Sequence, residues 1–228
     1  MIEKKIIIAL DCDNLKNALD IIKALKQEAF AFKIGYEFFF NFGIEGYKSI
    51  QNENIRIFLD LKLHDIPNTV KKGIFAISKL NPYFTTIHLS GGDDMQIAAN
   101  ISKQKTKILG VSVLTSLNSE QTQKFYFNKD IRNIVSNFAT YALNNKLDGI
   151  VCSPKEIQTI KKITLNKLLI ITPGIRPLNY KGSKDDQERT MTPKEAIDIG
   201  ADYLVIGRPI TQSNDPLKEL KSINLSIE

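Results

Sequence analysis

The sequence predicts a single-domain (β/α)8 barrel, an α/β fold, spanning residues 1–228. Eight short apolar runs alternate with segments of helical spacing along the chain, which is typical of parallel strands joined by helices. The length of 228 residues suits one such barrel, and no linker interrupts it. An open doubly wound sheet is the structural alternative. It typically has fewer strands and needs a glycine-rich turn after the first one, whereas residues 11–14 contain no glycine.

The predicted strands are apolar runs that end at polar or turn-forming residues. The first is a β-branched run closed by an acidic residue, the fourth is ended by two glycines, and the seventh ends at Pro173-Gly174. In chain order, the eight predicted strands are residues 6–11, 32–35, 56–63, 85–90, 107–113, 149–153, 168–172 and 203–207.

Helices are predicted where apolar residues recur every three or four positions. Three more should begin at Pro154, Pro193 and Pro216, because proline suits the first helical turn and each follows a capping Ser, Thr or Asp. The residues around Pro193 also form a capping-box pattern. Residues 176–190 are the one long irregular stretch, and loops of that length are often functional. The helices predicted from spacing are residues 15–28, 36–49, 67–80 and 131–145.

Composition argues against several classes of protein. The net charge is +6, but the lysines are scattered, so we expect no nucleic-acid partner; the positive field would attract a phosphorylated small molecule. No apolar run reaches the roughly 18 residues of a membrane span, and the N-terminus lacks a secretory pattern, which predicts a cytoplasmic protein without membrane contact. Cys12 is expected to be a small core residue, and neither Cys12 nor Cys152 has the C-x-x-C partner that a zinc site would need.

The third predicted strand carries charges at its end. Asp60 and Lys62 lie two positions apart, so they should project to the same side of the strand. Burying an unpaired charge costs several kcal/mol, so a carboxylate beside an ammonium at this position indicates a functional site. The alternative is an ion pair that merely neutralises itself.

Other strands also end in polar residues, and active sites of such barrels lie at this rim. Each has a structural interpretation as well. Asp11 can cap a helix, and Lys33 can extend from a strand end to solvent. Residues 115–116 can form a plain turn, and His64 and His88 can be core histidines. The common location of these polar groups favours a site, whose further candidates are Asp11, Lys33, Thr115, Ser116, Arg176, Gly207 and Arg208.

A phosphate site is predicted after the eighth strand. Gly207 lets backbone N–H groups approach a phosphate closely, and Arg208 supplies a planar fork for its oxygens. Barrels of this kind often bind phosphate in the loops after strands seven and eight. Gln187, in the long loop, is placed to reach over as a lid contact.

Residues 60–69, with the sequence DLKLHDIPNT, carry a close family resemblance. The chain resembles orotidine 5'-phosphate decarboxylases of the bacterial type almost from end to end. Further matching segments follow in the right order: Ala9-Leu10-Asp11, Lys33 before Ile-Gly, His88 before Ser90-Gly-Gly, Leu114-Thr115-Ser116, Pro173-Gly174-Ile175-Arg176, Asp186-Gln187 with Arg189, and Ile206-Gly207-Arg208.

The resemblance implies decarboxylation of orotidine 5'-phosphate to uridine 5'-phosphate, a step of de novo pyrimidine biosynthesis, without a cofactor or metal. Lys62 would donate the proton to C6 of the pyrimidine. Asp60 and Asp65 would flank Lys62, and Lys33 would complete an alternating charge array. The protein would be a homodimer with shared active sites, in which the neighbouring subunit contributes Asp65 and Thr69.

The resemblance also implies how the rest of the nucleotide is held. Asp11 and Lys33 would bind ribose hydroxyls, and either Thr115 or Ser116 would face the pyrimidine. The phosphate would be gripped by Gln187, Gly207 and Arg208, with help from Arg176.

The chemistry explains why charged residues are needed. Decarboxylating this ring leaves a carbanion without an obvious electron sink, so placed charge must stabilise it. Two alternatives remain. Magnesium-dependent sugar-phosphate decarboxylases and hexulose-phosphate synthases share the Asp-x-Lys-x-x-Asp element, but they use an acid on the second strand where this chain has Lys33, which repels a cation. A non-catalytic nucleotide sensor would bind without turnover.

Overall fold

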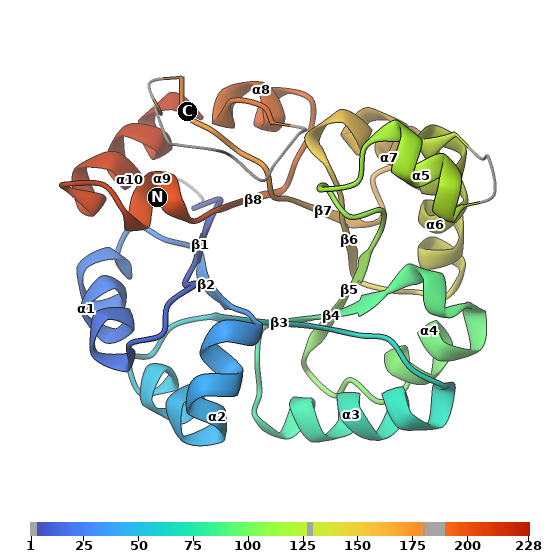
Figure 1. Cartoon of the computed structure of the whole chain (residues 1–228), viewed down its shortest axis with the longest axis horizontal. Helices are drawn as coiled ribbons and strands as arrows, with labels where there is room; N and C mark the ends of the chain where they lie inside the picture. The colour runs from blue at the N-terminus through green and yellow to red at the C-terminus, as the bar shows by residue number, and fades with distance from the viewer. Residues whose placement is uncertain (1–3, 127–129, 179, 181–189) are drawn as a thin grey trace.

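Eight parallel strands close into a barrel in chain order, with β8 pairing back to β1 (Figure 1). The computed structural model describes residues 4–126, 130–178, 180 and 190–228. The predicted barrel is confirmed, and the strand positions agree with the prediction to within a few residues. The strands are β1 (Ile6–Ala9), β2 (Ala31–Ile34), β3 (Ile57–Leu63), β4 (Phe84–His88), β5 (Lys107–Val111), β6 (Gly149–Val151), β7 (Leu169–Thr172) and β8 (Tyr203–Ile206).

Helices surround this barrel on the outside (Figure 1). They are α1 (Leu15–Leu25), α2 (Tyr36–Gln51), α3 (Pro67–Lys79), α4 (Asp93–Asn100), α5 (Ser119–Phe125), α6 (Ile131–Asn144), α7 (Ile157–Thr164), α8 (Pro193–Asp198), α9 (Arg208–Thr211) and α10 (Pro216–Ser226). Short 3₁₀ segments, η1 (Leu89–Gly91) and η2 (Pro154–Glu156), precede α4 and α7.

The predicted helix starts are confirmed by their caps. The hydroxyl of Thr192 accepts a hydrogen bond from the Glu195 N–H at the start of α8, and Asp215 caps α10 in the same way. Asn14 caps α1, so the interpretation of Asp11 as a helix cap is wrong. Asp11 is therefore available for another role.

Sequence analysis missed three helices, namely α4, α5 and α9. Helix α5 does carry a start signal, because Asn118 and Gln121 form a capping box. Helix α4 has two acidic residues in its first turn but little amphipathic pattern, and α9 is a single turn of four residues. Short helices of this kind are set by packing against the barrel more than by local propensity.

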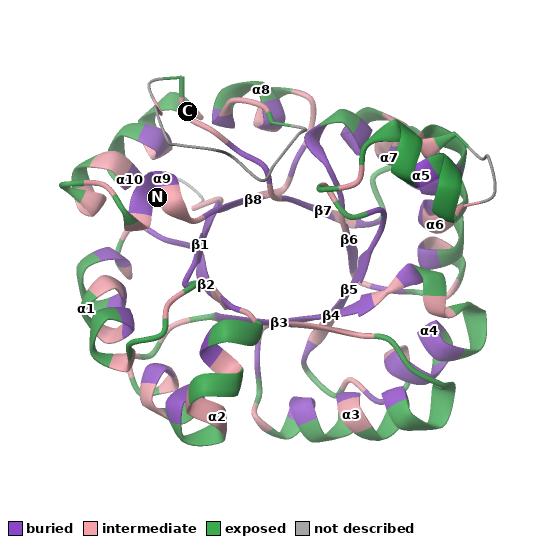
Figure 2. Cartoon of the chain, in the orientation of Figure 1, coloured by how far each residue is buried: buried purple, intermediate pink, exposed green. Residues whose placement is uncertain are grey.

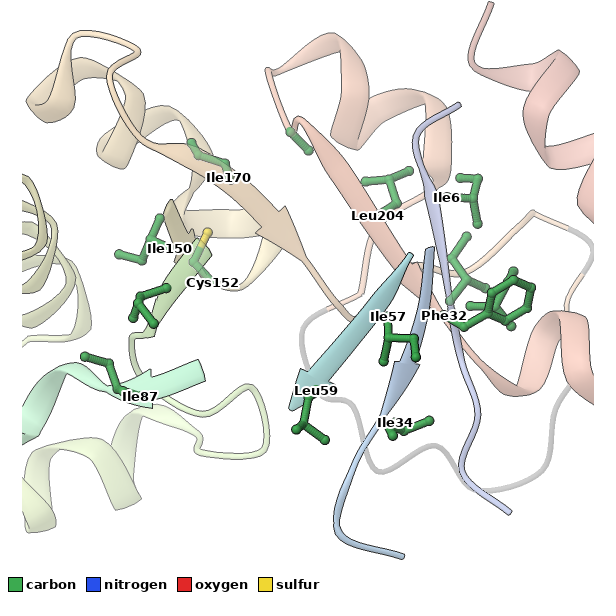
Figure 3. Packing of buried hydrophobic residues seen from close by; sticks show 14 of the residues in the cluster. Ile6, Phe32, Ile34, Ile57, Leu59, Ile87, Ile150, Cys152, Ile170 and Leu204 are labelled. Atoms are coloured by element: carbon green, nitrogen blue, oxygen red, sulfur yellow. The ribbon is translucent and has the colours of Figure 1, made fainter. Parts of the chain in front are cut away.

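Two apolar layers hold the barrel together. Alternate strand residues point outward and pack under the helices, as Ile6 and Ile8 do, while Ile7 and Ala9 point into the barrel. Figure 2 shows the strands buried and the outer helix faces exposed. Figure 3 shows part of the outer layer, which includes Cys152, whereas Cys12, predicted to be a core residue, is only partly buried and packs against this layer.

The N-terminal end of the barrel is filled by aromatic side chains. Phe30 stacks on Tyr203 with ring centroids 4.1 Å apart, and the Arg56 guanidinium lies 4.7 Å from the Phe30 ring centroid. These residues lie at or just before the starts of β2, β3 and β8. The interior is therefore closed at this end, and polar side chains gather at the other. None of the helices in the described ranges is long and apolar enough to cross a membrane.

Candidate active site

A cavity of about 440 Å³ opens at the C-terminal ends of the strands. Inward-facing apolar residues of the strands, such as Val111, Val151 and Val205, form its walls. The polar residues that the sequence placed at this rim converge here. Those that line the cavity are Asp11, Lys33, Asp60, Lys62, Thr115, Arg176, Gly207 and Arg208.

Four of these residues form a chain of alternating charges. The Lys33 ammonium lies 3.4 Å from a carboxylate oxygen of Asp11 and 3.6 Å from Oδ2 of Asp60, and the Lys62 ammonium lies 2.8 Å from the same Oδ2. The Asp60 and Lys33 side chains are only 9% and 13% exposed, whereas that of Asp11 is 63% exposed. The chain of charges therefore runs from solvent into the barrel.

The two lysines keep Asp60 ionised. Burial would raise the pKa of the Asp60 carboxyl, but the charges of Lys33 and Lys62, with hydrogen bonds from Lys62 and Thr86, hold that pKa below its usual value. Burial would lower the pKa of Lys33, and the carboxylates of Asp60 and Asp11 instead raise it. Asp60 and Lys33 are therefore charged at neutral pH, and the lysine ammoniums can stabilise negative charge that develops on a ligand beside them.

Strand β3 is irregular where it carries Lys62. Its pairing with β4 shifts register between Leu59 and Leu63, and Lys62 has a positive φ of 43°. Asp60 and Lys62 do project together as predicted, but a bulge contributes to this and not the regular alternation of a strand alone. Positive φ is unfavourable for a side chain with a Cβ, so the surrounding contacts must hold this conformation.

Sequence analysis missed the residues that hold this bulge. The Thr86 hydroxyl on β4 donates to Oδ1 of Asp60 at 2.8 Å, and the Lys62 N–H donates to the Thr86 oxygen at 2.9 Å. The Tyr36 hydroxyl donates to the Leu61 carbonyl oxygen at 3.1 Å, and the Tyr36 ring lies 5.9 Å from the Lys62 ammonium. The sequence signal that could have found Thr86 is a hydroxyl side chain at an inward-facing position of β4.

The part of the cavity that follows β7 and β8 suits an anion. A Cβ on Gly207 would lie 3.2 Å from the Cβ of Ala9, so the backbone there is tightly packed. Arg208 and Arg176 bring positive charge to the lining, and Gln212, which sequence analysis also missed, adds an amide. Gln187 lies outside the described residues.

Three predicted site residues within the described ranges do not line this cavity. Asp65 and Thr69 are exposed, and the Asp65 carboxylate accepts a hydrogen bond from the Ile66 N–H at 2.7 Å. Ser116 is also exposed, whereas Thr115 lines the cavity.

The two histidines lie near the bulge with ring centroids 5.4 Å apart. His64 is exposed and His88 is half-buried, so neither is a core histidine as the structural interpretation proposed. Burial and the charges of His64 and Lys62 lower the pKa of His88.

The site does not suit a divalent cation. Lys33 occupies the place on β2 where an acidic ligand would be needed, and its ammonium already contacts Asp60. Within the described parts of the chain, no group of three or more His, Cys, Asp or Glu side chains is arranged to hold a metal ion.

Comparison with known proteins identifies the family. The model of the orotidine 5'-phosphate decarboxylase / HUMPS family matches residues 4–223. This chain belongs to that family. It is 40% identical over 233 residues to the orotidine 5'-phosphate decarboxylase of Pseudoalteromonas atlantica, with all of both chains covered. It is 44% identical over 224 residues to that of Wolbachia sp. subsp. Brugia malayi, covering 97% of this chain and 98% of the relative.

Solved structures of the family have the same fold. The crystal structure of orotidine 5'-phosphate decarboxylase from Lactobacillus acidophilus has a TM-score of 0.85 at 33% identity, covering 99% of this chain and all of that one. The enzyme of Methanocaldococcus jannaschii, solved with the inhibitor BMP, has a TM-score of 0.80 at 26% identity, with 99% of each chain covered.

We expect Asp60→Asn to lower the free energy of unfolding by about 3 kcal/mol at neutral pH, because two partly buried ammoniums lose their shared counter-charge. The pKa of Asp60 is lowered by folding. Its stabilisation is therefore complete above the ordinary carboxyl pKa of about 3.9 and is lost as the pH falls through the folded-state pKa. In urea titrations, the stability difference between wild type and Asp60→Asn should shrink below about pH 4. A constant difference down to about pH 2 would contradict this assignment.

Proposed function

We propose that this protein decarboxylates orotidine 5'-phosphate to uridine 5'-phosphate without a cofactor, as a cytoplasmic enzyme of de novo pyrimidine biosynthesis. One observation carries the proposal. In a chain of this family, the Asp11–Lys33–Asp60–Lys62 array lines the same cavity as Arg176, Gly207 and Arg208. A nucleotide needs both parts, charge at the base and a grip on the phosphate.

Lys62 is the proposed proton donor. As the bond from C6 to the carboxylate carbon breaks, carbon dioxide leaves and the electron pair remains on C6. The Lys62 ammonium stabilises that negative charge and then transfers a proton to C6, which completes the product. Asp60 keeps Lys62 in place at 2.8 Å, and Lys33 adds a second positive charge at 3.6 Å from Asp60.

The rest of the nucleotide supplies binding energy. We assign Asp11 and Lys33 to the ribose hydroxyls, Thr115 to the pyrimidine, and Arg208 with Gly207 to the phosphate. Arg176 and Gln187 complete the phosphate grip in this proposal. Removing one electrostatic donor typically costs about 3–4 kcal/mol, and enzymes lower barriers by about 8–23 kcal/mol. One lysine cannot account for the rate, so binding of the remote phosphate must also be used for positioning.

We further propose a homodimer in which the neighbouring subunit supplies Asp65 and Thr69. Both residues are exposed and lie outside the cavity of their own chain. Exposed apolar side chains accompany them, with Ile66 67%, Phe75 48% and Ile101 69% exposed. Helices α3 and α4 pack side by side (Figure 1), and such apolar surface commonly marks a protein interface.

The direct test is incubation of EDTA-treated protein with orotidine 5'-phosphate while the ultraviolet absorbance of the pyrimidine is followed. We expect turnover without added metal. Activity on a keto-sugar phosphate that requires magnesium would instead support the sugar-phosphate decarboxylase alternative. Tight binding of uridine 5'-phosphate without any turnover would support a nucleotide sensor.

Lys62→Ala should lower kcat by more than about 1,000-fold, because it removes both the proton donor and a stabilising charge. Binding of uridine 5'-phosphate, measured by calorimetry, should remain. Lys62→Arg is the matched control, since it retains a positive charge but cannot readily give up a proton. Normal turnover in either variant would remove Lys62 from the proposed role.

Arg208→Ala should lower kcat/KM by about 100-fold or more, mostly through a higher KM, because a charged phosphate contact is lost. Lys218→Ala removes one positive charge from the exposed face of α10 and serves as the control. Steady-state kinetics of both variants provide the measurement. An unchanged KM in Arg208→Ala would place the phosphate elsewhere.

The shared site predicts complementation. Lys62→Ala and Asp65→Ala homodimers should each be inactive, but a heterodimer of the two contains one site with both native residues. Mixing equal amounts under conditions that exchange subunits should restore about a quarter of wild-type activity. Light scattering establishes the dimer, and a mixture that stays inactive while subunits exchange would place Asp65 in its own subunit's site.

A further inference from the structure

We propose that Thr86 is a positioning residue of the reaction, which fixes Asp60 and the backbone of Lys62 relative to each other through one buried hydroxyl. The inference rests on the proposed decarboxylase function. Thr86 lies on β4, next to the irregular part of β3, and is completely buried. It lines no part of the cavity, so its role is exerted through Asp60 and Lys62.

The direction of both hydrogen bonds is determined by chemistry. A backbone N–H can only donate, so the Thr86 oxygen accepts from the Lys62 N–H at 2.9 Å. The single hydroxyl hydrogen is then given to Oδ1 of Asp60 at 2.8 Å, and an ionised carboxylate can only accept it. The hydroxyl therefore joins the carboxylate and the lysine backbone by two bonds that cannot be exchanged.

This bridge sets the rotation of the Asp60 carboxylate. Oδ1 is occupied by Thr86, which turns Oδ2 toward the ammoniums of Lys33 and Lys62 at 3.6 and 2.8 Å. Without the hydroxyl, the carboxylate can rotate, and its distances to both lysines are no longer fixed. A displacement of about 1 Å at a reacting group is enough to cost about 100-fold in rate.

The same bridge supports the unusual backbone of Lys62. The register shift between β3 and β4 removes the regular ladder at this point, and Lys62 has a positive φ. Thr86 provides the partner that the Lys62 N–H would otherwise lack in a buried place. On the other side of the bulge, the Tyr36 hydroxyl binds the Leu61 carbonyl oxygen.

The neighbouring Thr85 offers a matched control. It is also completely buried on β4, and its hydroxyl donates to the Leu59 carbonyl oxygen of β3 at 2.9 Å. It therefore joins the same two strands, but its hydrogen bond goes to Leu59 and not to Asp60 or Lys62. Thr85→Val and Thr86→Val remove the same group from adjacent positions with nearly equal changes in volume.

The experiment compares Thr86→Val, Thr86→Ser and Thr85→Val by kinetics over a range of pH. Thr86→Val should lower kcat by about 100-fold with little change in KM, and Thr86→Ser should restore most of it. Thr85→Val should retain the wild-type kcat, even if its loss of thermal stability is as large as that of Thr86→Val. Normal kcat in Thr86→Val, or an equal loss in Thr85→Val, would overturn the proposal.

The pH dependence of kcat/KM provides a second measurement, which a loss of stability alone would not change. The groups facing Asp60 are Lys33 from β2, Lys62 from β3, Tyr36 from α2 and His88 from β4, with Asp11 acting through Lys33. The Thr86 hydrogen bond lowers the pKa of Asp60, so its loss should raise that pKa. The acid limb of kcat/KM should then move to higher pH in Thr86→Val and stay in place in Thr85→Val.

A measurement without substrate separates this inference from the proposed function. Titration of the Asp60 carboxyl carbon by NMR in ¹³C-labelled protein should show a higher pKa in Thr86→Val than in wild type and Thr85→Val. If wild type fails to turn over orotidine 5'-phosphate, the proposed function is wrong, and the titration still decides whether Thr86 fixes Asp60. An unchanged Asp60 titration in Thr86→Val would overturn the positioning role.

Discussion

The site depends on one ionised carboxylate held inside the barrel between two ammoniums. Asp60 is buried, and leaving water would favour its neutral form, yet Lys33 and Lys62 within 3.6 Å keep its pKa low. Burying several charges in this way costs free energy unless each charge has an opposite charge at close range. The barrel meets this requirement by placing consecutive strands about 5 Å apart, so that β2, β3 and β4 each contribute one partner.

The two ends of the barrel interior differ in composition, one being aromatic and the other charged. At the N-terminal end, Phe30 stacks on Tyr203, and the guanidinium of the exposed Arg56 lies over the Phe30 ring. At the C-terminal end, the inward positions of the same strands change from apolar to charged, as from Phe58 to Asp60. The rigid aromatic end supports the charged end, and hydrogen bonds and charges act more strongly in such a partly dehydrated site.

The division of the cavity follows the shape of a nucleotide. Charge that can act on the base comes from β2 and β3, while the arginines and Gly207 follow β7 and β8. Groups that bind the substrate far from the reacting carbon can supply binding energy that positions the reacting atoms. In the proposed homodimer, the exposed Asp65 and Thr69 would complete the neighbouring subunit's site.

The sequence by itself determined much of this protein. The alternation of apolar runs and helical spacing predicts the barrel, and the caps predict the starts of α8 and α10. The residues at and near the strand ends predict eight positions that line the cavity, six of them charged. These features are local, because side-chain alternation and capping depend on residues close together in the chain.

Only the tertiary structure decided how the charges are held. Pairing between strands produces the positive φ of Lys62, the register shift in β3 and the hydrogen-bond bridge from Thr86. Residues 62 and 86, which this bridge joins, are separated in the chain by a whole helix. Helix α4 and the contribution of Gln212 to the cavity likewise depend on packing against distant segments. Local patterns carry no information about which hydroxyl of a neighbouring strand will meet a given carboxylate, because that is set by the register of the closed barrel.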